Sequence, residues 1–253
     1  MRDRTIVATR GVALLILALS GFAPPRDGGK ALLSAEGGSV VLASHPVGGG
    51  LSLPAHERFV YARTVGDTKS SLVVEGTRKS ERGKSWYELV SRAPDEDAVY
   101  TLDAASLALL RSDVTTRTAT TTIHRVTEVV EDRLVLAPDE LEISATAPFQ
   151  QRMRLIPFDE KPVYRLSFQG SQSVPGFSLV LAFAGREKVE AGGRTWDCWR
   201  LEVGAKGIVG GLFGKSRYWY QADWPHVLVK FEGPSSFPGS PLTRLELVSY
   251  SSP

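Results

Sequence analysis

Histidine and cysteine are the residues that most often hold metal ions, and their placement in this chain speaks against a metal site. The four histidines, His45, His56, His124 and His226, lie in unrelated contexts, with no His-x-His or His-x-x-x-His pair among them. Cys198 is the single cysteine, which excludes a thiolate zinc site, a Cys-x-x-Cys redox motif and an internal disulfide. The sequence therefore predicts no resident metal and no cofactor.

The sequence also lacks the motifs of serine hydrolases and of phosphate-binding loops. No Gly-x-Ser-x-Gly pentapeptide is present. The segment Gly204–Ser216 ends in Gly-Lys-Ser, as phosphate loops do, but Val209 stands where that motif needs its first glycine. We expect a long hairpin loop here or, as the functional alternative, a lid whose apolar tip covers a ligand or contacts lipid. The residues of that tip are Ile208, Val209, Leu212 and Phe213.

Aromatic side chains gather near the C-terminus, within 29 residues. They are Trp196, Trp199, Tyr218, Trp219, Tyr220 and Trp224. Because successive side chains of a strand point to opposite faces, one member of each neighbouring pair should face the core and the other should face away. The set is typical of core packing with cross-strand aromatic pairs, and the alternative is an aromatic-lined cavity that binds an apolar ligand.

Three consecutive acids, Asp95-Glu96-Asp97, follow Pro94 and are most simply a solvated turn. The paired carboxylates of glycoside hydrolases are brought together by the fold and have no fixed sequence spacing. A hydrolase with dispersed carboxylates is therefore kept as an alternative, although the sequence assigns no catalytic residue.

The elements that must position these residues are strands. From Arg58 onward, apolar and polar residues alternate with period two, and turn residues interrupt them every eight to fifteen positions. Strands are predicted throughout 58–250, including one over Gln150–Ile156, and the two helix-capable windows are short. The predicted fold class is all-β, a long antiparallel meander curled into a barrel or half-barrel with few or no long helices.

The N-terminus has the pattern of a secretory signal. Three arginines precede or flank an uncharged apolar run, Gly11–Ala23, and Pro24-Pro25 ends it. Thirteen residues are too few for a membrane-spanning helix, which needs about 20. We expect a cleaved signal peptide over 1–23, and Phe22 stands where a lipoprotein would need its lipidated cysteine. The expected location is periplasmic, without a lipid anchor.

The remaining chain divides into two parts. Residues 24–57 are rich in Gly, Pro and Ser and are predicted to form a flexible arm, whereas residues 58–253 form the antiparallel β domain. Loss of residues 1–23 removes three Arg and one Asp and lowers the formal net charge from +2 to zero. A neutral domain lacks the basic surface that nucleic acid requires, so no nucleic-acid partner is expected.

Several short segments resemble a bacterial family known as a domain of unknown function, made of exported antiparallel-β proteins. They are Tyr100–Leu107, Val189–Leu201, Arg217–Tyr220, Pro225–Glu232 and Leu245–Tyr250. A more distant, purely architectural likeness is to periplasmic lipoprotein carriers of the LolA and LolB kind. The resemblance implies an envelope protein and supplies no catalytic residues.

These observations predict an exported, non-enzymatic protein that binds an apolar or amphipathic, lipid-like molecule on the concave face of its sheet. The rival hypotheses are the hydrolase and a structural adaptor that docks an envelope protein through a sheet edge. Cys198, between two tryptophans, is expected to be a small core residue.

Overall fold

The structure is a computed structural model that describes residues 53–105, 107, 109–128, 140–143, 149–161, 163–168, 177–205, 215–234 and 241–252. The predicted signal peptide, most of the predicted arm and the four predicted lid residues lie outside these ranges. Within them, Leu53 packs in the core and the first strand begins at His56.

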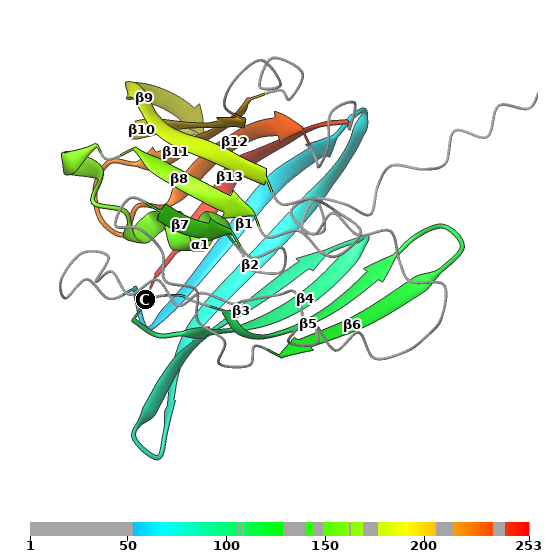
Figure 1. Cartoon of the computed structure of the whole chain (residues 1–253). Helices are drawn as coiled ribbons and strands as arrows, with labels where there is room; N and C mark the ends of the chain where they lie inside the picture. Colours follow the sequence, from blue (N-terminus) through cyan, green and yellow to red (C-terminus); the bar gives the residue numbers. More distant parts are fainter. Residues whose placement is uncertain are drawn as a thin grey trace, which may run out of the picture.

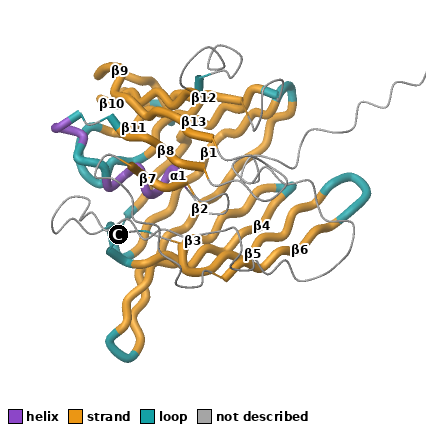
Figure 2. The backbone as a smooth tube through the Cα atoms, viewed as in Figure 1, coloured by secondary structure: helices purple, strands orange, loops and turns teal. Residues whose placement is uncertain are grey.

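Strands dominate the described residues (Figures 1 and 2). They are β1 His56–Val65, β2 Thr68–Glu81, β3 Lys84–Ala93, β4 Glu96–Asp103, β5 Leu109–Arg117, β6 Thr122–Glu128, β7 Glu140–Ile143, β8 Tyr164–Phe168, β9 Phe177–Ala191, β10 Arg194–Ala205, β11 Ser216–Gln221, β12 Leu228–Pro234 and β13 Leu242–Ser251. All belong to one 13-stranded sheet in the order β6-β5-β4-β3-β2-β1-β13-β12-β11-β10-β9-β8-β7. The sheet curls without closing, and β6 and β7 form its two edges. The predicted all-β class and curled meander are confirmed.

One pairing departs from the antiparallel meander, because β7 and β8 run parallel. Their connection contains three short helices, α1 Phe149–Arg152, η2 Met153–Leu155 and η3 Phe158–Glu160. A parallel return needs such a long crossover, which a tight turn cannot supply.

The strand predicted over Gln150–Ile156 was wrong, because this segment forms α1 and η2. Apolar Met153 and Leu155 alternate with arginines there, and in so short a run the alternation does not separate strand from helix. Both arginines of the segment, Arg152 and Arg154, are buried, which a half-exposed strand would not allow. Tertiary contacts of these side chains override the local pattern.

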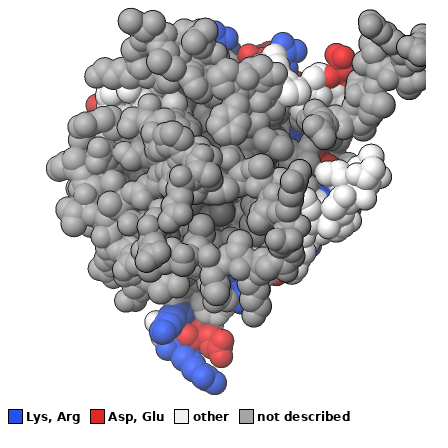
Figure 3. Space-filling model, turned by 45° about the vertical axis from the view of Figure 1, so that its right-hand side comes forward, with Lys and Arg blue, Asp and Glu red and all other residues white. Residues whose placement is uncertain are grey.

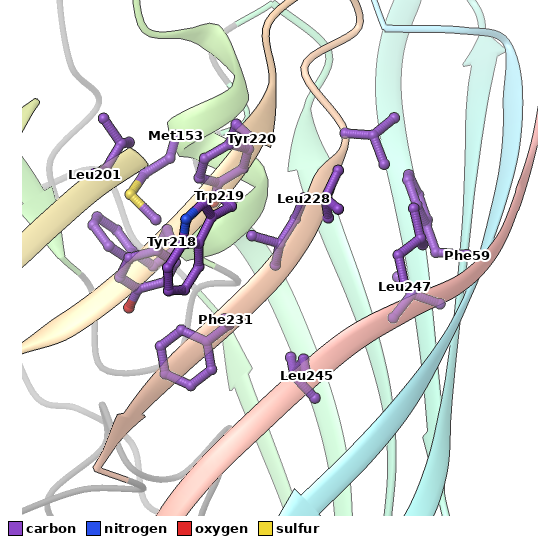
Figure 4. Close-up of a cluster of buried hydrophobic side chains, with 14 of the residues drawn as sticks. Phe59, Met153, Leu201, Tyr218, Trp219, Tyr220, Leu228, Phe231, Leu245 and Leu247 are labelled. Carbon is purple, nitrogen blue, oxygen red and sulfur yellow. The ribbon is translucent and has the colours of Figure 1, made fainter. Parts of the chain in front are cut away.

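The alternation predicted for the first strand is present in β1, where Phe59, Tyr61 and Val65 are buried. Gly66, with φ of +56°, begins the two-residue turn into β2. Buried residues of β1–β5 and β9–β13 contribute to one hydrophobic core. Figure 4 shows the part of this core between Phe59, the strands β10–β13 and Met153 of η2.

The β2–β3 hairpin extends beyond the rest of the sheet (Figure 1), and side chains of both charge signs gather at its end (Figure 3). Lys79 and Glu88 form an ion pair of 2.6 Å across it. Both faces of the hairpin end meet water, which accounts for its polar sequence from Arg78 to Ser85.

Candidate functional site

Three of the six predicted aromatic residues share the concave face. Trp199 lies opposite Tyr220 in the β10–β11 pairing. Tyr218 packs against Phe231 with ring centroids 4.8 Å apart and meets Phe149 of α1 edge to face. The Tyr220 hydroxyl donates a 2.8 Å hydrogen bond to the Gln150 carbonyl. These rings therefore anchor the helical segment to the sheet.

Trp196 and Trp219 point to the opposite face, as the alternation predicts, but both are buried and belong to the hydrophobic core, so neither faces away from it as expected. The Trp219 indole donates a 2.5 Å hydrogen bond to Glu187, and the Lys230 ammonium lies 5.1 Å from its ring centroid. Trp196 donates to the Ala191 carbonyl at 3.0 Å, and the Arg194 guanidinium covers its ring. Trp224, the sixth residue, is half-buried and meets His226 edge to face. The structure thus splits the predicted ligand-binding set between two faces of the sheet.

A fully buried ion pair inside the curl joins the helical segment to the first strand. The Arg154 guanidinium of η2 donates two hydrogen bonds to the Glu57 carboxylate of β1, at 2.6 and 2.9 Å, and both side chains are 0% exposed. Arg154 also donates to Gln151 Oε1 at 2.8 Å and to the Pro225 carbonyl at 3.0 Å. The Tyr87 hydroxyl of β3 donates to the same carboxylate.

The opposite charges of this pair balance each other, and both the guanidinium and the carboxylate are hydrogen-bonded. We therefore expect the pair to have a structural role, which is to hold the helical segment against the sheet. The Phe59 ring lies 5.3 Å from the guanidinium and completes its enclosure. Sequence reasoning missed the pair because Glu57 was placed at the end of the predicted arm and Arg154 in a predicted strand. The available signal was an arginine between Met153 and Leu155 in an apolar run.

Gly76 of β2 leaves space for the side chain of Tyr87, whose hydroxyl donates a hydrogen bond to Glu57. A Cβ atom at Gly76 would lie 2.0 Å from the Tyr87 hydroxyl oxygen, so Gly76→Ala must push that hydroxyl away from Glu57. We expect the substitution to lower the free energy of unfolding by about 1–3 kcal/mol. Urea melts would measure the loss.

Gly204→Ala is the matched control, because its Cβ would meet only the flexible Lys215 side chain, at 3.4 Å. Equal melts for the two alanine variants would contradict the role given to Gly76.

A second polar group lies on the buried face of β4 and β5. Glu96, Ala98 and Tyr100 follow one another on the buried side of β4. Thr116 stands opposite Glu96 and Ser112 opposite Tyr100 in the β4–β5 pairing, and both hydroxyl residues are buried. Apolar Leu89 and Leu102 adjoin this group. The arrangement places a few polar side chains beside buried apolar ones, a combination that small-molecule sites also use.

The acidic run that the sequence indicated as a solvated turn is only partly solvated. Asp95 receives two hydrogen bonds from Arg63, at 2.5 and 3.0 Å, and Asp97 is paired with Arg117 at the surface. Glu96, between them, turns inward and is 6% exposed. Burial above all, and then the neighbouring Asp95 charge, raises the pKa of the Glu96 carboxyl to about 7.

The Tyr100 hydroxyl is buried and unpartnered. Its side chain is 1% exposed, and no group of the described residues forms a hydrogen bond with its hydroxyl. Burial and then the nearby Glu96 charge raise the pKa of this hydroxyl well above its ordinary value, so it stays protonated. A buried hydroxyl without a partner costs about 1–3 kcal/mol, which a bound polar group would recover.

Metal binding finds no support in the described residues, since they contain no cluster of three or more His, Cys, Asp or Glu side chains suited to an ion. The short helices of the described ranges do not reach the length or apolarity needed to span a bilayer.

Cys198 is 0% exposed, which confirms the prediction of a core residue. Burial, followed by the Asp197 and Glu187 charges, raises the pKa of its thiol to about 12. Because the thiolate is the reactive form, we expect an aromatic disulfide reagent to label the folded protein at least a hundredfold more slowly than the protein in concentrated urea. Absorbance of the released thiolate would report both rates, and fast labelling of the folded form would contradict the buried placement.

The fold and this polar group define an open, curled antiparallel β protein with a candidate small-molecule site on its concave face. No protein-family model matches the sequence, and no curated protein matches it. Among solved structures it is similar to a β-barrel-like protein of the domain of unknown function DUF1849 from Brucella abortus, with 11% identity over 79% of this chain and 98% of that one and a TM-score of 0.42.

Two further solved structures are similar over much of their length. The hypothetical lipoprotein YmcC from Escherichia coli has 12% identity over 80% of this chain and 89% of that one, with a TM-score of 0.33. A DUF1329 family protein from Desulfovibrio piger has 12% identity over 79% and 86%, with a TM-score of 0.28. None of these three proteins is described as a carrier of the LolA or LolB kind.

Proposed function

We propose that this protein binds an amphipathic small molecule on the concave face of its sheet, over β3, β4 and β5. The buried Tyr100 hydroxyl without a partner is the observation that carries the proposal, because it offers a hydrogen bond inside an otherwise apolar surface. The apolar part of the ligand would lie against Leu89, Ala98 and Leu102. This placement moves the expected site away from the aromatic cluster of β10 and β11, where Tyr220, Trp219 and Trp196 already have hydrogen-bond partners.

The test is a titration of the purified protein with 1-decanol, which has one hydroxyl on an apolar chain, followed by calorimetry. We expect saturable binding that Tyr100→Phe weakens about tenfold, because one buried hydrogen bond to the ligand is lost. Tyr100→Phe should still fold, since an unpartnered hydroxyl contributes nothing to stability. Tyr218→Phe, which alters a buried tyrosine of the other half of the sheet, should bind as the parent does. Absence of 1-decanol binding would overturn the proposal.

The proposed setting is the bacterial envelope, reached by export. The arginine-flanked apolar run supports it, and we expect the protein isolated from its own cells to begin between Gly21 and Arg26. Intact-mass measurement of the purified protein would locate the new N-terminus. Recovery of a soluble cytoplasmic form that still begins at Met1 would contradict the export.

A further inference from the structure

We propose that the polar end of the ligand is a primary ammonium group, held by the Glu96 carboxylate together with the Tyr100 hydroxyl. This inference rests on the proposed function and names its ligand class. Both side chains project from the same face of β4, four residues apart, into the concave side of the sheet.

The charges around Glu96 leave one negative charge without a partner. Asp95 is held by Arg63 and Asp97 by Arg117, so each flanking carboxylate already has its own guanidinium. In the described part of the chain, no group donates a hydrogen bond to the Glu96 carboxyl. When Glu96 is ionised, three carboxylates lie beside two guanidinium groups, and a ligand cation would complete the set.

The hydrogen-bonding groups beside Glu96 also suit an ammonium. An ammonium has three donors and no acceptor. The Glu96 carboxylate, the oxygen of the Tyr100 hydroxyl and the hydroxyl of Thr116, opposite Glu96 in the register, are three acceptors on one face. A ligand carboxylate would instead meet the like charge of the ionised Glu96 carboxylate, which disfavours it.

Binding of a cation to this site should release a proton from the protein. In the described residues, the charged and titratable groups that interact with Glu96 are Asp95, Asp97, Arg63 and Tyr100. In this environment the Glu96 carboxyl is largely protonated below neutral pH. The ammonium favours the ionised carboxylate, so the carboxyl proton passes to the buffer as the ion pair forms. Calorimetry at pH 6 in two buffers of different ionisation enthalpy would count that proton.

The experiment compares three probes with the same ten-carbon chain: decylamine, 1-decanol and decanoate. We expect the parent protein to bind decylamine at least tenfold more tightly than 1-decanol, and decanoate more weakly than either. Glu96→Gln should abolish the preference for decylamine, leave 1-decanol binding within about twofold, and abolish proton release. Glu88→Gln, which changes an exposed carboxylate of β3, is the matched control and should bind as the parent does.

The outcomes separate the two proposals. If 1-decanol binds and decylamine binds no more tightly, the ammonium inference is overturned while the amphipathic site stands. Retention of the decylamine preference in Glu96→Gln likewise overturns it. If none of the three probes binds, the proposed function itself falls.

Discussion

Arg154→Met is expected to lower the free energy of unfolding by about 3–5 kcal/mol, the largest effect of any single substitution considered for this fold. The substitution leaves an unbranched apolar side chain at this position but removes the only cation that contacts the buried Glu57 carboxylate in the described residues. A charge left in the core without its partner must either remain desolvated or take up a proton, and both cost free energy. Guanidinium-induced unfolding followed by tryptophan fluorescence would measure the change.

Two further variants test the cause. Glu57→Leu combined with Arg154→Met should recover most of the lost stability, because well-packed apolar side chains can replace a buried ion pair. Arg186→Met is the matched surface control: Arg186 pairs with Asp197 at 2.6 Å, but the two side chains are 49% and 50% exposed. That change should stay within about 0.5 kcal/mol. If Arg154→Met lowers the free energy of unfolding by less than about 1 kcal/mol, the structural role of the Glu57–Arg154 ion pair is contradicted.

The ligand-free protein should lose on the order of 3 kcal/mol of stability between pH 4.5 and pH 7 through Glu96 alone. The pKa of Glu96 rises from 4.5 to about 7 on folding, chiefly through burial. Within that window the folded protein binds more protons at this site than the unfolded chain does. The stability that the protonated Glu96 carboxyl contributes is therefore fully present below pH 4.5 and is lost as the pH rises through 7.

Glu96→Gln isolates this effect, because it keeps the shape of the side chain and removes its titration. The variant and the parent should have similar stabilities at pH 4, and the variant should be the more stable by pH 8. Carboxyls with lowered pKa values, such as Glu75 beside Arg92 and Arg58, titrate in both proteins and cancel in the difference. Urea melts across the range would give the curve. A constant difference at every pH would show that Glu96 is not buried as described.

Much of the sheet could be predicted because its information is local. Phe59, Tyr61 and Val65 alternate with polar neighbours, and Gly66-Asp67 provides the turn. The short helices could not be predicted, because Arg154 is helical and buried only in the presence of Glu57, 97 residues away in the chain. The parallel β7–β8 pair depends on that same segment as its crossover.

The candidate site, too, could be predicted from the sequence only in part. The aromatic cluster was visible in the sequence, and the alternation separated Trp196 from Trp199 and Tyr218 from Trp219, although all four side chains are buried. Glu96 was noticed only as part of a charged turn, because nothing in three adjacent acids tells which one faces inward. The unpartnered Tyr100 hydroxyl is a property of the packed structure: a strand tyrosine is ordinary until the groups around it are known.

Among the described strands, the one that comes latest in the sequence, β13, stands in the middle of the sheet. β13 is the seventh of the 13 strands from either edge and joins the half that ends in β6 to the half that ends in β7. Until Leu242–Ser251 has been synthesised, β1 and β12 each keep an unpaired edge, and the two halves have no ladder between them. A chain interrupted before this strand would hold two half-sheets, each able to pair with other chains. The two half-sheets can therefore join only after Leu242–Ser251 has been synthesised.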